Sequence, residues 1–218
     1  NPLGDDGLVA LFHVLRGTNV QFLDISNCML SSASGVVIAD LIRACPILNS
    51  LQIDNNTLGD EALTEVAKAF QESVSMASLN LERTLMGSAG CSAIADAIMR
   101  QRKLRSINIA ENHTLSVEDV KTLLHAVSRV HSCERMDLSD LKLPDSEDLL
   151  RSLMAVFAAN DHLDRVLLQH NPMASGFPDG AMTREFALQL ADGASLAQFA
   201  QHQSTVGGNT SSILSLAS

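Results

Sequence analysis

The sequence predicts a right-handed, curved α/β solenoid with parallel strands on its concave face and helices on its convex face. A five-position apolar pattern recurs about every 28 residues, and a stretch with helical periodicity follows each recurrence. Hydrophobic residues make up 46% of the 218 residues and aromatic residues only 3%, which indicates an aliphatic core. Internal periods of this length are typical of arrays whose units bury their apolar faces against one another.

The repeat is clearest in "LNSLQIDNNTLGDEAL", residues 48 to 63. Leu48, Leu51, Ile53, Asn56 and Leu58 give the spacing L-x-x-L-x-L-x-x-N-x-L. The corresponding positions elsewhere are 20, 23, 25, 28 and 30; 76, 79, 81, 84 and 86; 104, 107, 109 and 112; 133, 136, 138, 141 and 143; and 163, 166, 168, 171 and 173. So many recurrences of one pattern indicate a genuine repeat.

Each unit predicts a strand followed by a helix. The alternating apolar positions indicate a short strand with one buried face. In "GDEALTEVAKAFQES", residues 59 to 73, the apolar residues form one helical stripe and Asp60 suits the helix N-terminus. Comparable helices are expected over 35–45, 89–102, 116–131 and 145–159. Short crossovers favour parallel strands and right-handed winding, and helices wider than strands make the stack curve.

The asparagine position of the repeat predicts a structural ladder. The chain must turn out of the strand there, and an amide side chain can pair the backbone groups that the turn leaves open. The polar or small occupants of this position are Cys28, Asn56, Thr84, Asn112 and Asn171. Leu141 takes the same position without any hydrogen-bonding group. We therefore expect an irregular loop near 139–145, with Asp140 replacing the missing amide.

The segments "NNTLGDEAL" and "NPLGDDGL" carry the motif N-x-L-G-D. On these residues and on the repeat, the chain resembles the leucine-rich-repeat superfamily over roughly residues 1–175, and its period is similar to that of the ribonuclease-inhibitor subfamily. Similar repeats occur in ribonuclease inhibitor, Ran GTPase-activating protein, tropomodulin and NOD-like receptors. The resemblance implies the solenoid fold and favours binding of other proteins.

Three segments are expected along the chain. Residues 1–175 form the repeats, and the first repeat is incomplete because its strand is absent. The strand beginning at Val20 would then be an open edge, which further repeats or another subunit would cover. Residues 176–202, with "MTREFALQLADGASLAQFAQH", predict a helical C-terminal cap. Residues 203–218 are rich in Ser and Gly and predict a flexible tail, in which "SSILSLAS" could alternatively pair as an edge strand.

Composition excludes several classes of function. The formal net charge of −10 disfavours nucleic acid as a partner. The four cysteines are isolated in sequence, which favours reduced thiols and a cytoplasmic location. No apolar run reaches 18 residues, so membrane insertion is not expected.

The sequence offers no pattern for catalysis or for a cofactor. The seven histidines lack zinc-ligand spacing, and no G-x-S-x-G, P-loop or G-x-G-x-x-G motif occurs. Cys28 and Cys133 occupy repeat positions and are better explained as small buried residues than as nucleophiles. We therefore predict a protein that is not an enzyme, without a metal, a cofactor or a small-molecule substrate.

The residues between the strand anchors predict a partner-binding concave face. The acidic members are Asp24, Asp54, Glu82, Glu111, Asp137 and Asp140, and the basic ones are Arg83, Arg105, Arg135 and Arg165. Such an acid-biased surface suits a protein partner with a basic surface. Phe22 would be exposed there, as a contact residue or under missing repeats. Alternatively, these residues are merely solvated, or binding uses the loops or the convex side.

Two other functions remain open. A regulator of a small GTPase, of the GTPase-activating type, is allowed by the resemblance, although no arginine matches a family catalytic position. The ligand-sensing arm of a NOD-like receptor is the other alternative.

Overall fold

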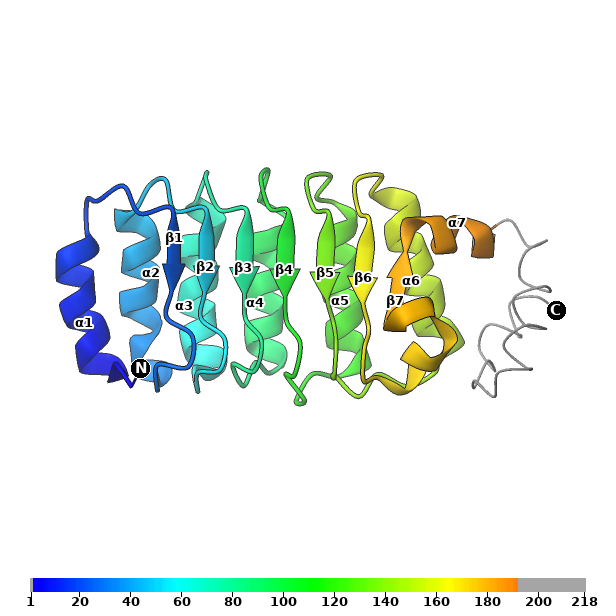
Figure 1. Cartoon of the computed structure of the whole chain (residues 1–218), viewed down its shortest axis with the longest axis horizontal. Coiled ribbons are helices and arrows are strands. Elements are labelled where there is room, and N and C mark those ends of the chain that lie inside the picture. The colour runs from blue at the N-terminus through cyan, green and yellow to red at the C-terminus, as the bar shows by residue number, and fades with distance from the viewer. Residues whose placement is uncertain (1, 192–218) are drawn as a thin grey trace.

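The computed structural model describes residues 2–191, in which strands and helices alternate along the chain. The strands form one layer and the long helices form a second layer behind them (Figure 1). The strands are β1 (Phe22–Asp24), β2 (Ser50–Gln52), β3 (Ser78–Asn80), β4 (Ser106–Asn108), β5 (Arg135–Asp137), β6 (Arg165–Leu167) and β7 (Ala181–Thr183). The helices are α1 (Gly4–Leu15), α2 (Gly35–Ala44), α3 (Gly59–Glu72), α4 (Ser88–Ile98), α5 (Val117–Ser128), α6 (Glu147–Ala159) and α7 (Arg184–Ala191).

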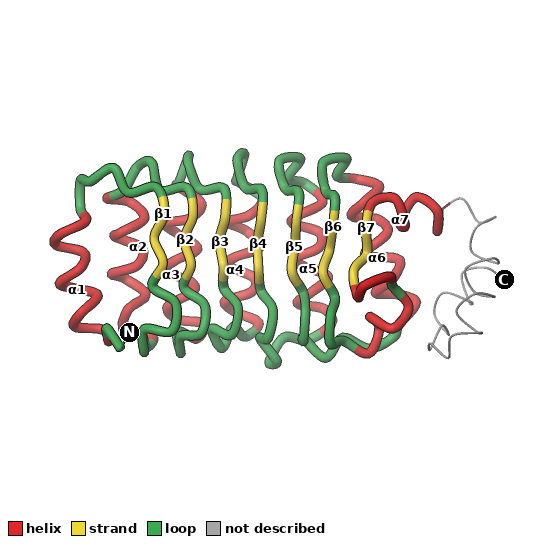
Figure 2. Tube along the Cα trace, viewed as in Figure 1, coloured by secondary structure: helices red, strands yellow, loops and turns green. Residues whose placement is uncertain are grey.

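The strands form a single sheet in chain order, β1 to β7 (Figure 2). Each pair from β1–β2 to β5–β6 is parallel, and the register places Leu23 beside Leu51 and Leu51 beside Leu79. A one-residue slip would turn these leucines out of the core, so the apolar pattern fixes the register. The predicted α/β solenoid with a parallel sheet is confirmed.

The core is a continuous aliphatic layer between the strands and helices. Phe70 of α3 and Phe157 of α6 are its largest buried side chains, with exposed fractions of 0% and 1%. Close packing of neighbouring helices depends on small residues: a Cβ on Gly35 would lie 2.4 Å from the Cα of Ala62. The contact between these two helices therefore requires a residue without a side chain at position 35.

Helix α1 precedes β1, in the part of the chain where the opening residues predicted the tail of a unit without its strand. The cap is not wholly helical: two 3₁₀ turns lie at Pro172–Gly176 and Pro178–Gly180, and β7 pairs antiparallel with β6 before α7 begins. Met182 is buried against the core, so packing outweighed the helical periodicity there. Residues 192–202 of the expected cap and the expected tail over 203–218 lie outside the described residues.

The ladder position contains hydrogen bonds between neighbouring units. The Oδ1 of Asn56 accepts the N–H groups of Cys28 and Leu30, both at 3.1 Å. Its Nδ2 donates to the carbonyls of Ile25 and Ile53, both at 2.9 Å. Asn112 and Asn171 make the same pattern of bonds to their own preceding units. An amide side chain thus connects alternate pairs of units.

The loop after β5 lacks regular structure from residue 138 to residue 146. The expectation that Asp140 would replace the missing amide was wrong. Its carboxylate faces His113, with 3.4 Å between Oδ2 and Nε2. The open N–H groups of Leu141 and Leu143 are instead paired by Oδ1 of Asn171, at 2.9 Å each.

Candidate functional site

The exposed side of the sheet, called here the strand face, presents rows of side chains because the strands are in register. The start row contains Phe22, Ser50, Ser78, Ser106, Arg135 and Arg165. The middle row contains Asp24, Gln52, Asn80, Asn108, Asp137 and Leu167. Backbone bonds extend the register into an end row: Ser26, Asp54, Glu82, Ala110, Ser139 and Gln169. A turn row follows: Asn27, Asn55, Arg83, Glu111, Asp140 and His170.

The acidic residues expected on this face do not form a single column. Asp24 and Asp137 lie in the middle row, whereas Asp54 and Glu82 lie in the end row. Glu111 and Asp140 lie in the turn row, after the strands have ended. Asp24 and Asp137 lie four residues after the first apolar anchor of their units, Asp54 and Glu82 six, and Glu111 and Asp140 seven. The spacing from the anchors therefore already separates these rows. The acidic set is therefore a band across the strand ends.

Asp54 lies at the centre of a hydrogen-bond network at the ends of β1 to β3. Its Oδ1 accepts from the hydroxyl of Ser26 at 2.6 Å and from Nδ2 of Asn80 at 2.8 Å. Its Oδ2 accepts from Nδ2 of Asn55 at 2.8 Å. These bonds hold a half-buried carboxylate in one position, so this charge is preorganised.

Glu82 is half-buried beside Asp54, and Nδ2 of Asn108 donates to its carboxylate at 2.9 Å. Burial raises the pKa of Glu82, Asn108 opposes this rise, and the negative charges of Glu111, Asp54 and Asp137 add to it. These carboxylates are thus close enough to repel one another. A cation brought to this point would relieve that repulsion.

The turn row has an unusual backbone. Its six residues all have positive φ angles, from 48° at Asp140 to 60° at His170. Asparagine, aspartate and histidine adopt this conformation most readily, but Arg83 and Glu111 also adopt it here. These two side chains form an ion pair, and Nη1 of Arg83 also donates to Oδ1 of Asn55 at 3.3 Å. The charged side chains of Arg83 and Glu111 are therefore held in place beyond the ends of the strands.

The remaining arginines of the expected site lie at the opposite ends of the strands. Arg105, just before β4, pairs with Glu134 at 2.8 Å. Arg135 and Arg165 are exposed in the start row, and no ion pair involves either of them within residues 2–191. The strand face is therefore basic at the starts of β4 to β6 and acidic at the strand ends.

Phe22 occupies the start row at β1 and is 61% exposed. It is the bulkiest apolar side chain on this face among the described residues. In the same row the next three strands present only serine.

The described residues contain no obvious centre for chemistry. Within residues 2–191, no three His, Cys, Asp or Glu side chains come together as a metal site would require. Burial raises the pKa of the Cys91 and Cys133 thiols to about 12 each, so both stay protonated at neutral pH. None of the helices over that range is long and apolar enough to cross a bilayer.

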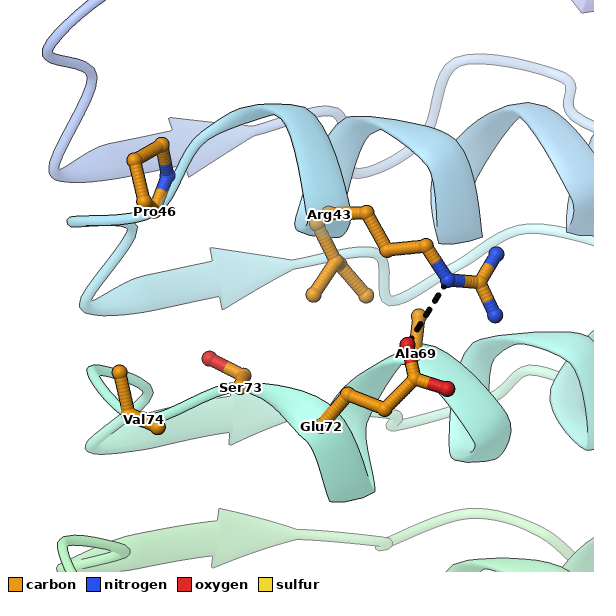
Figure 3. Close-up of a pocket in the computed structure, with 7 residues that line it drawn as sticks. Arg43, Pro46, Ala69, Glu72, Ser73 and Val74 are labelled. Carbon is orange, nitrogen blue, oxygen red and sulfur yellow. Dashed lines mark hydrogen bonds and ion pairs between the residues drawn. The ribbon is translucent and has the colours of Figure 1, made fainter.

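A pocket of about 320 Å³ opens between the C-terminal ends of α2 and α3 (Figure 3). Pro46 and Val74 line it, and the ion pair of Arg43 and Glu72 crosses it at 3.0 Å. An arginine and a glutamate that neutralise each other do not make a nucleophile and a base.

Two buried amide side chains among the described residues were not anticipated. Nδ2 of Asn160, which is fully buried, donates to the carbonyls of Val127, Val130 and Cys133 at 2.9 to 3.3 Å. Gln101 donates to the carbonyl of Phe70. Both follow a helix and precede a strand, and this position in the repeat was the available signal. Both have a structural role and lie off the strand face.

Comparisons with known proteins agree with this architecture. No family model matches the chain. The chain is 29% identical over 166 residues to the human "NACHT, LRR and PYD domains-containing protein 14", which covers 75% of this chain but only 15% of that protein. Among solved structures, the actin-binding site 2 of leiomodin-1 has a TM-score of 0.59 at 11% identity, over 72% of this chain and 88% of that one. A chain of the yeast Rad7 and Elc1 complex has a TM-score of 0.56 at 17% identity, over 78% and 40%.

Proposed function

We propose, from the premise that this chain is a leucine-rich-repeat protein, that it is a non-enzymatic interaction module whose strand face binds another protein. The partner would place a basic surface over the acidic strand ends. Binding would use a preformed surface with little rearrangement, since the carboxylates are already held by their hydrogen bonds.

The neighbouring carboxylates of Asp54 and Glu82, held by hydrogen bonds in the end row, are the observation that supports this proposal most directly. Unfavourable charge crowding on a folded surface costs stability, and a bound cation would remove that cost. Lysine or arginine side chains of a partner could reach Glu82 and Asp137 from solvent, since both are only half-buried. The network around Asp54 would keep its charge fixed while the partner docks.

The solved structures provide a coarser argument. One is described as an actin-binding site of leiomodin-1, and the other is a complex of Rad7 with Elc1. Solenoids of this fold therefore occur in proteins that associate with other proteins. This favours a protein partner without identifying it.

The experiment compares affinity captures from the native cell. The variant combines Asp54→Lys, Glu82→Lys and Glu111→Lys, and we expect it to lose the proteins that the unmodified chain retains. The control combines Glu61→Lys, Asp96→Lys and Glu118→Lys, which are exposed on the helices and change the net charge equally. Thermal unfolding of both variants establishes that they are folded. Recovery of the same proteins by the strand-face variant would refute the proposal.

A second candidate is favoured by the human relative. Its name includes NACHT and PYD domains in addition to the repeats, and this chain corresponds to only 15% of it. On this basis the chain would serve as the repeat arm of a larger receptor of the NOD-like type. Sequencing the intact transcript in the source cell would test this, since it would reveal or exclude a nucleotide-binding domain in the same protein.

A further inference from the structure

A groove of about 540 Å³ crosses the loops that precede the strands, at the edge opposite the acidic band. We propose that this groove binds an acidic segment of a partner protein, rich in aspartate or glutamate. Its lining residues come from five consecutive loops between Asn49, before β2, and His162, before β6. The six that matter here are Ala77, Arg102, Lys103, Arg105, His131 and Ser132.

The shape of the groove follows from the sequence. The backbone ladder continues ahead of the strands: the N–H of Ala77 donates to Asn49, and that of Arg105 donates to Ala77, at 2.7 and 2.8 Å. This row therefore has a small alanine between the larger side chains of Asn49 and Arg105. The missing bulk at Ala77 leaves the hollow, and the long side chains form its walls.

The charge of the groove is positive where a ligand would lie. Arg102 and Lys103 are exposed, and neither forms an ion pair within the described residues. Glu134 is neutralised by Arg105 at 2.8 Å. Arg135 and Arg165, also unpaired in that range, extend the positive surface along the start row.

The same groove also contains two histidines and a serine. His131 and His162 lie 3.5 and 2.8 Å from the carboxylate of Asp161, so that acid is occupied by the histidines. The hydroxyl of Ser132 is buried and has no hydrogen-bond partner among the described residues. Rotation of this side chain would let it donate to a carboxylate in the groove.

The overall charge of −10 does not prevent such binding. The Debye length is about 8 Å at physiological ionic strength, so charges on the far side of the solenoid are largely screened. A carboxylate in contact with Arg102 and Lys103 interacts mainly with those cations. An acidic peptide is favoured over nucleic acid because the unpaired cations of the groove, Arg102 and Lys103, form one short cluster, which suits a few carboxylates better than a continuous phosphate backbone.

This inference rests on the proposed function only in assigning a protein partner, since it concerns the opposite edge of the strand face. A partner that used both edges would carry acidic residues at the strand starts and basic residues at the strand ends. The two proposals can fail separately, because the groove is tested with a defined peptide and the acidic band with captured proteins.

The test measures fluorescence anisotropy of a labelled eight-residue peptide of alternating Glu and Gly, titrated with the full 218-residue chain at low salt. We expect saturable binding that weakens with added salt, and no comparable binding of the same peptide with Gln or Lys in place of Glu. The double variant Arg102→Ala/Lys103→Ala should weaken binding by about fivefold or more, as expected for the loss of two exposed charge contacts.

The control is Lys68→Ala/Arg151→Ala, which removes the same net charge from the helices α3 and α6. It should leave the affinity of the peptide within about twofold. Circular dichroism of both variants shows whether they are folded. Equal losses in the two variants, equal binding of the Gln peptide, or tighter binding of an eight-nucleotide single strand would each overturn the proposal.

Discussion

The side-chain oxygen of Asn171 accepts the backbone N–H of Leu141 at 2.9 Å and thereby supports a ladder position that has no polar side chain of its own. Asn56 supports Cys28 and Asn112 supports Thr84 in the same way. The asparagines therefore occur in every second unit, and each connects its unit to the preceding one. Where two neighbouring units are not connected by an asparagine, backbone hydrogen bonds connect them at this position, as from the N–H of Gly59 to the carbonyl of Thr84.

The substitution Asn56→Leu should destabilise the fold by roughly 1–3 kcal/mol, because it leaves buried N–H and C=O groups of two units unpaired. Urea-induced unfolding followed by circular dichroism measures the change. Asn49→Leu provides the control, since Asn49 is exposed and makes one side-chain bond, to the carbonyl of Ser75. The control should stay within about 0.5 kcal/mol of the unmodified chain. Equal losses would mean that the ladder adds nothing beyond local packing.

The fold could be predicted because each apolar anchor has one structural role in every unit. Leu51 and Leu79 face the core in adjacent strands, and no other register would bury both. The strand of the cap could not be predicted, because "AMT" has no periodicity and pairs only after the solenoid exists. The antiparallel pairing of Met182 with Val166 is a tertiary effect.

The candidate site could be predicted only in part. The residue types on the strand face followed from the alternation of the strands. Their rows also follow from the spacing, since Glu82 lies six and Glu111 seven residues after the first anchor of its unit, and the expected single column overlooked this difference. The groove before the strands was also missed, because Arg102 and Lys103 lie in a loop outside the repeat pattern.

Replacement of Phe22 by alanine should leave the free energy of unfolding within about 0.5 kcal/mol, because its side chain is 61% exposed. If the strand face binds a partner, the same change should weaken binding, as loss of an exposed aromatic contact does. Phe70→Ala is the matched comparison. Phe70 is fully buried, so its loss should cost about 3–5 kcal/mol. If Phe22→Ala destabilised the chain as much as Phe70→Ala does, the exposed position of the Phe22 side chain would be contradicted.

The substitution Glu82→Gln should stabilise the chain at pH 7 and have no effect at about pH 3. The pKa of Glu82 is raised in the folded chain above its model-peptide value of 4.5, first by burial and then by its acidic neighbours. Ionisation of Glu82 therefore destabilises the fold above that value, and the penalty vanishes once both states are protonated. Glutamine keeps an oxygen for Asn108. We expect a rise of about 1–2 °C in the melting temperature at pH 7.

Exposed Glu61 on α3 provides the control for the pH experiment, since Glu61→Gln removes a carboxylate from the first turn of a helix and should not raise the melting temperature at pH 7. A fall in the melting temperature of Glu82→Gln at pH 7 would show that its carboxylate is net stabilising. The repulsion invoked at the strand ends would then be absent.

The four cysteines should react only when the chain unfolds. All four are buried, and burial raises the pKa of Cys91 and Cys133 to about 12, so their thiolate fraction at pH 8 is about one in ten thousand. Incubation of the native chain with an aromatic disulfide reagent at pH 8 should label fewer than one thiol per chain in an hour, whereas guanidinium should expose all four within minutes. Rapid native labelling of Cys91 or Cys133, located by mass spectrometry, would show that the core opens locally without global unfolding, because both thiols are fully buried in the folded chain.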